Sequence, residues 1–336
     1  MQLNFEMRST SRITDSVFYL IIAILIYFHI CHNWLYGMDD SYITFRYAQN
    51  LRLGIGLVFN EGERYFGSTA MGMAIVLAAL SLIVDNTYLF ILGDLPWPPG
   101  NQIPLIAHWI STASVGTIAI LAYHIAKNHI KSLWAIMISV LFAIQLFSAE
   151  YMNAASGHET YLFLACLILS GYILIYKERV FWAGVLLGIT TTFRPDALLY
   201  VVILTGWLIL VSAHAGFARQ ERQRLFMFLI GYILVAIPWF IFCGVYFGQV
   251  FPGTLTAKQA QPLLGHWQNF TIGNVFSKLI SQMRLPMFLA ISAVLFGALV
   301  LRVITDKFPQ VFWNLINNHL MVLRGFLWSR SRICII

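Results

Sequence analysis

Long apolar runs recur along most of the chain and constrain its fold more than any other feature. A membrane-spanning helix needs about 20 consecutive, mostly apolar residues. Runs close to this length lie at 17–36, 71–92, 103–126, 132–149, 160–176, 180–193, 197–215, 225–247 and 286–303, and a weaker amphipathic segment lies near 309–328. The sequence therefore predicts an all-α, polytopic transmembrane bundle of about nine or ten membrane helices.

The charge content supports lipid as the main solvent. Only 10% of the 336 residues are charged, whereas a soluble domain carries about a quarter. The net charge is +7, but the basic side chains form short clusters at 127–131, 177–179 and 219–224. Such clusters between apolar runs are typical of cytoplasmic loops and anionic-lipid contact, so no nucleic-acid surface is predicted.

The N-terminal segment predicts the orientation in the membrane. Arg8 and Arg12 precede the first apolar run, and no small-residue cleavage site follows it. We interpret the run as an uncleaved membrane helix with a cytoplasmic N-terminus. If 71–92 and 103–126 both span, however, the basic cluster at 127–131 falls on the same side as the first loop. The sequence leaves open whether one segment fails to cross or the charge signal misleads.

Arg194-Pro195-Asp196 interrupts the apolar runs at 180–193 and 197–215. A proline disfavours helical geometry at the residue before it, so these runs are predicted to be a broken or re-entrant pair. A charged residue between apolar runs is costly and is usually paired or functional. Asp196 is the nearest candidate partner for Arg194.

The first loop, 37–70, contains adjacent carboxylates at Asp39 and Asp40. We expect a short helix lying on the membrane, with a stop at Gly54 and a turn at 60–62. One aspartate is enough to cap that helix. Two neighbouring like charges raise a pKa, which suits a general base. The residues alone leave capping and catalysis equally open.

Several motifs, taken in order, resemble those of GT-C-fold glycosyltransferases of the arabinofuranosyltransferase-like branch, which includes cell-wall arabinan and pilin arabinosyltransferases. The matching stretches are DDSYITFRYA at 39–48, GLVFN at 56–60, GER at 62–64, ASGHET at 155–160, TFRPD at 192–196, YFGQVFPGT at 246–254 and AK at 257–258. The resemblance implies a plasma-membrane enzyme with a polyprenyl-phosphate sugar donor. Its acceptor would be a glycan, lipid or protein on the non-cytoplasmic side, and its base an acidic residue of the first loop.

The chain also departs from that family's pattern. Relatives often carry an acidic residue where Phe66 stands and a proline near Ala70, and His158 replaces an apolar residue. Most relatives are longer. We therefore expect a GT-C-like membrane domain at 1–303 and a short C-terminal tail at 304–336, as in a minimal or truncated form.

The predicted site combines a base with cations for a departing phosphate. The predicted catalytic residues are Asp39 and Asp40, and the predicted substrate-binding residues are Arg46, Arg64, Glu159, Arg194, Asp196 and Lys258. We favour Asp39 as the base and Asp40 as its partner or a metal contact. A single base implies inversion at the sugar. No metal-ligand spacing is visible, although some members of the family use a divalent cation.

Several of these residues have simpler explanations. Arg46 and Arg64 could contact lipid headgroups, and Glu159 could cap the helix that follows it. Lys258, in the second long loop at 248–285, could be solvated, and the histidines are expected to be structural. At the level of the whole chain, a lipid or glycolipid transporter and an inactive GT-C remnant are the alternatives. No internal repeat of the kind found in transporters is visible.

Overall fold

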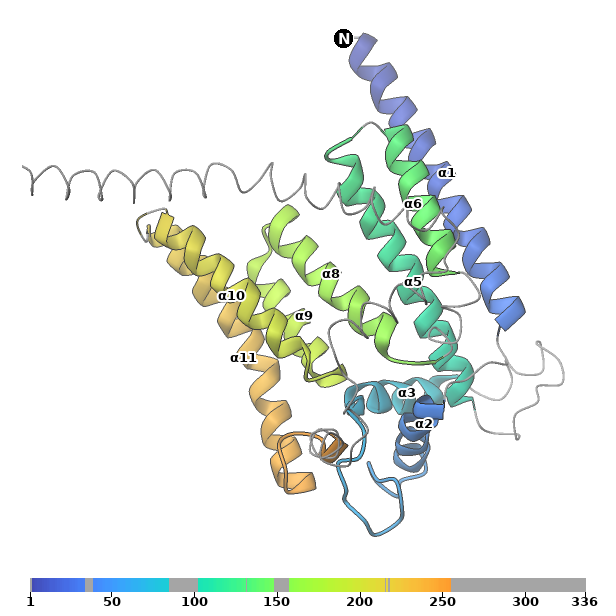
Figure 1. Ribbon diagram of the computed structural model, residues 1–336, viewed down its shortest axis with the longest axis vertical. Helices are drawn as coiled ribbons and strands as arrows, with labels where there is room; N and C mark the ends of the chain where they lie inside the picture. The colour runs from blue at the N-terminus through green and yellow to red at the C-terminus, as the bar shows by residue number, and fades with distance from the viewer. Residues whose placement is uncertain are drawn as a thin grey trace, which may run out of the picture.

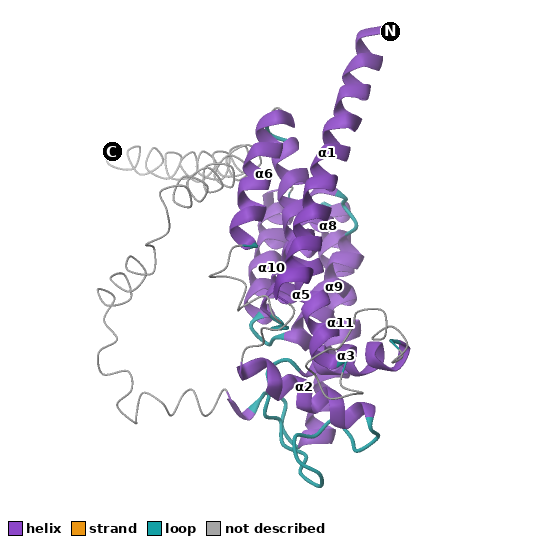
Figure 2. Cartoon of the chain, turned by 90° about the vertical axis from the view of Figure 1, so that its right-hand side faces the viewer, coloured by secondary structure: helices purple, strands orange, loops and turns teal. Residues whose placement is uncertain are grey.

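The computed structural model describes residues 2–33, 39–84, 102–130, 132–147, 157–214, 216 and 218–254, which form helices and loops without a strand (Figures 1 and 2). The helices are α1 (Gln2–Asn33), α2 (Asp39–Arg52), α3 (Met71–Ile83), α5 (Ile103–Lys127), α6 (Ser132–Leu146), α8 (Thr160–Tyr176), α9 (Val180–Phe193), α10 (Ala197–His214) and α11 (Arg219–Phe247). The all-α prediction is confirmed for these residues. The predicted segments at 286–303 and 309–328 lie outside them.

The helix ends follow local stop signals in the sequence. Helix α9 ends where expected, because Arg194, before Pro195, adopts an extended conformation with φ −155° and ψ 131°. Helix α11 ends before Gly248, whose φ of 71° is left-handed and favours glycine. The break between α9 and α10 is therefore the one that Pro195 predicts.

Helix α3 differs from the predicted spanning helix at 71–92, of which residues 85–92 lie outside the described part of the chain. It has 13 residues and ends at Ile83, because Val84 leaves the helical conformation with ψ 89°. A helix of this length rises about 20 Å, which is less than the hydrocarbon core of a bilayer. Figure 1 shows α3 lying across the lower ends of the steep helices α5 and α9.

The placement of α3 removes the conflict over the basic clusters. Helix α5 runs from the level of α3 to the opposite end of the bundle, where Lys127 lies (Figure 1). The turn at 177–179 and the start of α11 lie at that same end. The basic residues at these three places are therefore separated from the loop after α2, which lies at the other end (Figure 2).

Glycines let the backbones of α9 and α11 come into direct contact. A Cβ atom on Gly184 of α9 would lie 2.1 Å from the carbonyl oxygen of Phe228, and one on Gly231 of α11 would lie 2.3 Å from that of Phe181. Small residues at helix contacts allow this close approach, which van der Waals packing then stabilises. The contact fixes α11 against the helix that ends at Arg194.

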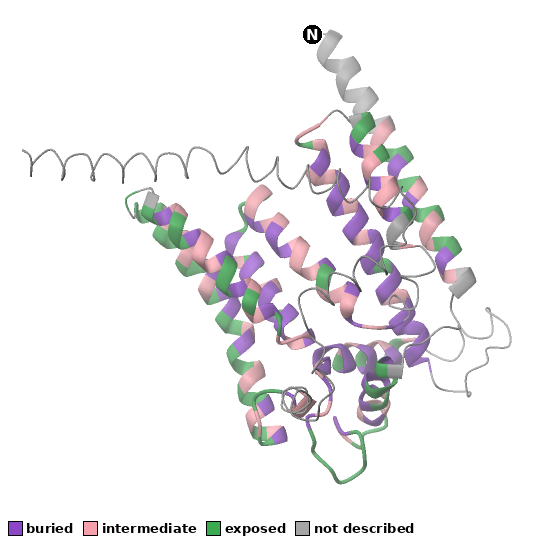
Figure 3. Cartoon of the chain, in the orientation of Figure 1, coloured by how far each residue is buried: buried purple, intermediate pink, exposed green. Residues whose placement is uncertain are grey.

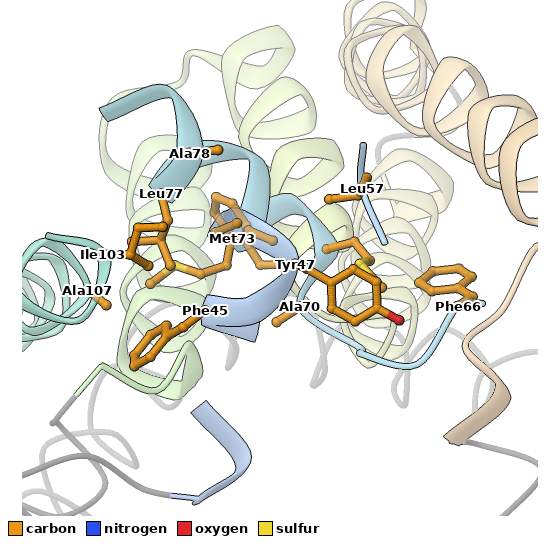
Figure 4. Close-up of a cluster of buried hydrophobic side chains, with 14 of the residues drawn as sticks. Phe45, Tyr47, Leu57, Phe66, Ala70, Met73, Leu77, Ala78, Ile103 and Ala107 are labelled. Carbon is orange, nitrogen blue, oxygen red and sulfur yellow. The ribbon is translucent and has the colours of Figure 1, made fainter. Parts of the chain in front are cut away.

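A buried apolar cluster holds α2 and α3 against the ends of α5, α9 and α11 (Figure 4). Its members include Phe45, Tyr47, Phe66, Met73, Leu77, Ile103, Phe193 and Phe247. Phe66 and Phe247 stack with ring centroids 4.7 Å apart. Figure 3 shows that buried residues concentrate on α3 and α5, whereas exposed residues follow α10, α11 and the loop after α2.

We expect Gly184→Ala to destabilise the bundle by about 1–3 kcal/mol, because the new methyl group meets backbone that cannot move aside. Gly206→Ala in α10 is the matched control, since nothing lies within 4 Å of its added Cβ. Thermal unfolding of the purified chain in detergent measures both. Equal midpoints for the two variants would contradict the packing described for α9 and α11.

Candidate functional site

A cavity of about 280 Å³ lies at the end of the bundle that carries α2 and α3. It is lined by Asp40, Ile43, Thr44, Gly67, Ser68, Thr69, His158, Glu159, Arg194 and Thr254. These residues come from α2, the loop that follows it, the turn before α8, the break between α9 and α10, and the segment after α11. The fold thus brings together segments that are far apart in the sequence.

Helix α2 presents one face to the cavity. Asp40, Ile43 and Thr44 are spaced three and four residues apart, so they share that face. One turn further on, Tyr47 is fully buried. Its hydroxyl donates a hydrogen bond to the Tyr65 carbonyl oxygen at 2.7 Å and accepts one from the Gly67 amide at 3.1 Å. Burial raises the pKa of Tyr47, so the hydroxyl keeps the proton it donates.

The loop after α2 is folded back on itself by side-chain hydrogen bonds. The Asn50 amide nitrogen donates to the carbonyl oxygens of Val58 and Phe59, at 2.8 and 2.9 Å. Gly54 and Gly62 take the left-handed conformations, φ 77° and 83°, that the predicted helix stop and turn require. These two local predictions are confirmed.

Two hydrogen bonds join this loop to the end of α11. The Leu57 amide donates to the Tyr246 hydroxyl at 3.0 Å, and the Gly253 amide donates to the Phe66 carbonyl oxygen at 2.9 Å. The second bond places Thr254 at the cavity. The first loop and the start of the second long loop therefore form the site together.

Arg194 is the central charge of the cavity. Its guanidinium lies 3.4 Å from a carboxylate oxygen of Glu159 and 2.7 Å from one of Asp196. The Glu159 side chain is only 7% exposed, whereas that of Asp196 is 55% exposed. A buried carboxylate is costly unless a cation pairs with it, so Glu159 depends on Arg194 far more than Asp196 does.

The structure bears on two simpler explanations: capping of a helix by Glu159 and pairing of Arg194 with Asp196. Glu159 occupies the N-cap position of α8, but its side chain makes no capping hydrogen bond. It faces Arg194 and also His158, whose Nδ1 lies 3.4 Å from its second carboxylate oxygen. Glu159 therefore stands at the start of α8 as predicted, but its side chain pairs with Arg194 and makes no hydrogen bond to the helix amides. The expected pairing of Arg194 with Asp196 is confirmed.

Other predicted site residues lie elsewhere. Arg46 is exposed and donates to the Phe59 carbonyl oxygen at 3.4 Å, and Arg64 lies over the Tyr246 ring at 4.9 Å from its centroid. Neither lines the cavity, and nor does Asp196. Asp39 begins α2, but its side chain is outside the described part of the structure, as is all of Lys258.

Several cavity residues had no clear signal in the sequence. Thr44, Ser68, Thr69 and Thr254 add hydroxyl groups, which are common in loops and carry no spacing signature. His158 lines the cavity, although a structural role was predicted for it. Within the described residues, no group of three or more histidine, cysteine, aspartate or glutamate side chains could hold a metal ion.

The arrangement suits a ligand that combines a phosphate with sugar hydroxyls. A guanidinium binds phosphate oxygens with paired, charge-assisted hydrogen bonds. A carboxylate such as Asp40 can accept a proton from an attacking hydroxyl. The threonine and serine hydroxyls can both donate and accept hydrogen bonds.

Sequence comparison finds one similar curated protein. The chain is 25% identical over 239 residues to a terminal beta-(1->2)-arabinofuranosyltransferase of Mycobacterium tuberculosis. The match covers 66% of this chain and 35% of the relative, so the chain spans about a third of that protein's length. No family model and no solved structure matches the chain.

We expect Arg194→Gln to destabilise the chain by about 3–5 kcal/mol, because it leaves the Glu159 carboxylate buried without its cation. Adding Glu159→Gln should recover more than half of that loss. Asp196→Asn, at the exposed partner, should cost at most about 1 kcal/mol. Thermal unfolding in detergent tests all three. A double variant no more stable than Arg194→Gln alone would contradict the assigned dependence of Glu159 on Arg194.

Proposed function

We propose that this chain is a membrane glycosyltransferase that transfers a sugar, such as a pentofuranose, from a polyprenyl-phosphate donor to an acceptor hydroxyl. The observation that carries the proposal is that Asp40 and Arg194 line one cavity together with four hydroxyl side chains. The similarity to an arabinofuranosyltransferase supports the same reaction class. It also suggests a pentofuranose as the first sugar to test.

The mechanism we propose is a single displacement at the anomeric carbon. Arg194 binds the phosphate of the donor and stabilises the charge that develops as the bond from carbon to the phosphate oxygen breaks. A carboxylate takes the proton from the acceptor hydroxyl while its oxygen forms the new glycosidic bond. The products are the glycosylated acceptor and the free polyprenyl phosphate, and the configuration inverts.

We assign the role of base to Asp40, because it lines the cavity. The sequence alone favours its neighbour Asp39 for that role, and we retain Asp39 as the partner or as a contact to a divalent cation. Glu159 positions Arg194 through their ion pair. Arg46 and Arg64 lie outside the cavity lining, which favours lipid-headgroup contact for both.

We also propose that the chain is a multi-pass protein of the plasma membrane. Two described helices, α5 and α11, are long and apolar enough to cross a bilayer. Helix α11 exposes large apolar side chains, among them Leu234, Ile241 and Val245 at 61%, 60% and 81% exposure. The cavity would then face the non-cytoplasmic side, because the basic clusters at the other end favour the cytoplasm.

Cysteine labelling tests this orientation. In a chain whose native cysteines are replaced, we expect Glu61→Cys to react with a membrane-impermeant maleimide in intact cells. Gln223→Cys, exposed at the opposite end, should react only after permeabilisation. The cysteine-free chain is the control. Reaction of both variants in intact cells, or the reverse pattern, would contradict the proposed topology.

Sugar transfer in membranes tests the activity. We expect the parent chain to transfer radiolabelled sugar from polyprenyl-phosphate arabinofuranose, and Asp40→Asn to lose transfer by about 100-fold or more, as expected for a general base. Asp39→Asn, at matched expression, reports on the neighbouring carboxylate. Glu61→Gln is the control, since this exposed carboxylate of the same loop does not line the cavity.

The outcomes separate the alternatives. Loss of transfer in Asp39→Asn but not in Asp40→Asn would move the base to Asp39. Transfer unaffected by both substitutions would contradict a carboxylate base in this loop. No transfer by the parent chain from any of several lipid-linked sugars would contradict the enzyme and favour a transporter or an inactive remnant.

A further inference from the structure

Tyr65 is an exposed aromatic residue beside the cavity. It belongs to the part of the first loop that precedes α3, and it is 55% exposed. Its backbone is held in place, because its carbonyl oxygen accepts the hydrogen bond from the buried Tyr47 hydroxyl. The side chain itself is not among the residues that line the cavity.

Two glycines make room for the Tyr65 ring. A Cβ atom on Gly67 would lie 3.1 Å from the ring carbon Cδ1 of Tyr65. One on Gly253 would lie 2.4 Å from its hydroxyl oxygen and 2.9 Å from Cζ. The ring therefore lies directly against the backbone of both segments. Gly67 lines the cavity and Gly253 precedes Thr254, which also lines it, so the ring stands at the cavity rim.

An unsatisfied hydroxyl belongs to Thr254, the residue after Gly253. The Thr254 hydroxyl oxygen is buried, and it has no hydrogen-bond partner among the described residues. A buried polar group of this kind needs a partner to offset its lost hydration. Thr254 also lines the cavity wall, so a ligand in the cavity would lie beside the residue that carries this hydroxyl.

An exposed aromatic ring and an unpaired hydroxyl at the same cavity suit a sugar. The face of a tyrosine ring is electron-rich, and the C–H groups on one face of a sugar carry partial positive charge. The sugar's hydroxyls point outward and can bond to threonine and serine. An apolar lipid chain would use the ring but leave the Thr254 hydroxyl unpaired.

We propose that Tyr65 is the stacking platform of an acceptor subsite, so that the acceptor is a glycan whose sugar rings pack on Tyr65 outside the cavity. This inference rests on the proposed glycosyltransferase function. The donor phosphate is assigned to Arg194, inside the cavity, whereas Tyr65 lies at the rim and is more than half exposed. A ring stacked there belongs to the part of the acceptor that remains outside when its terminal hydroxyl reaches Asp40.

Acceptor kinetics and saccharide binding of the full chain test the subsite. The variants are Tyr65→Ala, Tyr65→Phe and the control Tyr42→Ala, which removes another exposed tyrosine that does not line the cavity. The probes are arabinofuranosyl and glucopyranosyl tetrasaccharides, titrated calorimetrically without donor and then used as acceptors. We expect at least one probe to bind and Tyr65→Ala to weaken it about 10-fold, consistent with loss of an aromatic contact.

Three further measurements test whether loss of stacking causes the weaker saccharide binding of Tyr65→Ala. Tyr65→Phe should stay within about 3-fold of the parent chain, because the ring remains. The KM for the lipid-linked donor and the thermal midpoint should not change in Tyr65→Ala, and Tyr42→Ala should behave as the parent does. A higher KM for the donor together with a lower thermal midpoint in Tyr65→Ala would mean a structural role for Tyr65 and would overturn the inference.

The remaining outcomes separate this inference from the proposed function. Tyr65-dependent binding of a saccharide by a chain that transfers no sugar would support the subsite while contradicting the enzyme. Transfer with saccharide affinity unchanged in Tyr65→Ala would support the enzyme, overturn the subsite and leave Tyr65 as an aromatic anchor at the membrane surface. Absence of any saccharide binding by the parent chain would also overturn the subsite.

Discussion

The ion pair between Arg194 and Glu159 is the interaction on which the site depends. Glu159 is nearly buried at the start of α8, and Arg194 reaches it from the break that Pro195 imposes after α9. Because an unpaired carboxylate cannot be held at low cost in such a place, the pair keeps these two chain segments together. The same pairing leaves Arg194 at the cavity wall, where a phosphate can meet it.

The part of the cavity formed by the first loop and the segment after α11 is held by hydrogen bonds rather than by ion pairs. The Tyr47 hydroxyl donates a hydrogen bond within the first loop, the Tyr246 hydroxyl accepts one from this loop, and the Gly253 amide donates one to it. These bonds hold the first loop and the segment after α11 in one arrangement. Glycines at the contacts of α9 with α11 let the helices approach closely enough to support it. Hydrogen bonds between segments can thus shape a polar site although loops form most of its wall.

The sequence predicted those features that local chemistry decides. Pro195 predicted the helix break, Gly54 and residues 60–62 predicted the ends of the first-loop helix and its turn, and the apolar runs predicted most helix bounds. It failed where tertiary packing decides. The run at 71–92 is apolar enough to span, yet α3 ends at Ile83 and lies across the bundle, where apolar neighbours bury it.

The candidate site was predictable only in part, for the same reason. Asp40, Glu159 and Arg194 were selected individually, and the fold brings them to one cavity. The cavity hydroxyls and the rim position of Tyr65 depend on contacts between distant segments, which periodicity and spacing do not encode. The role of Glu159 as the buried partner of Arg194 likewise depends on a residue 35 positions away.

The most direct test is a cryo-electron microscopy structure of the chain bound to a phosphonate analogue of polyprenyl-phosphate arabinofuranose. We predict a phosphonate oxygen about 3 Å from the Arg194 guanidinium, as in charge-assisted pairs, and the sugar between it and Asp40. A phosphonate bound at Arg46 or Arg64, with the sugar outside the cavity, would contradict this account.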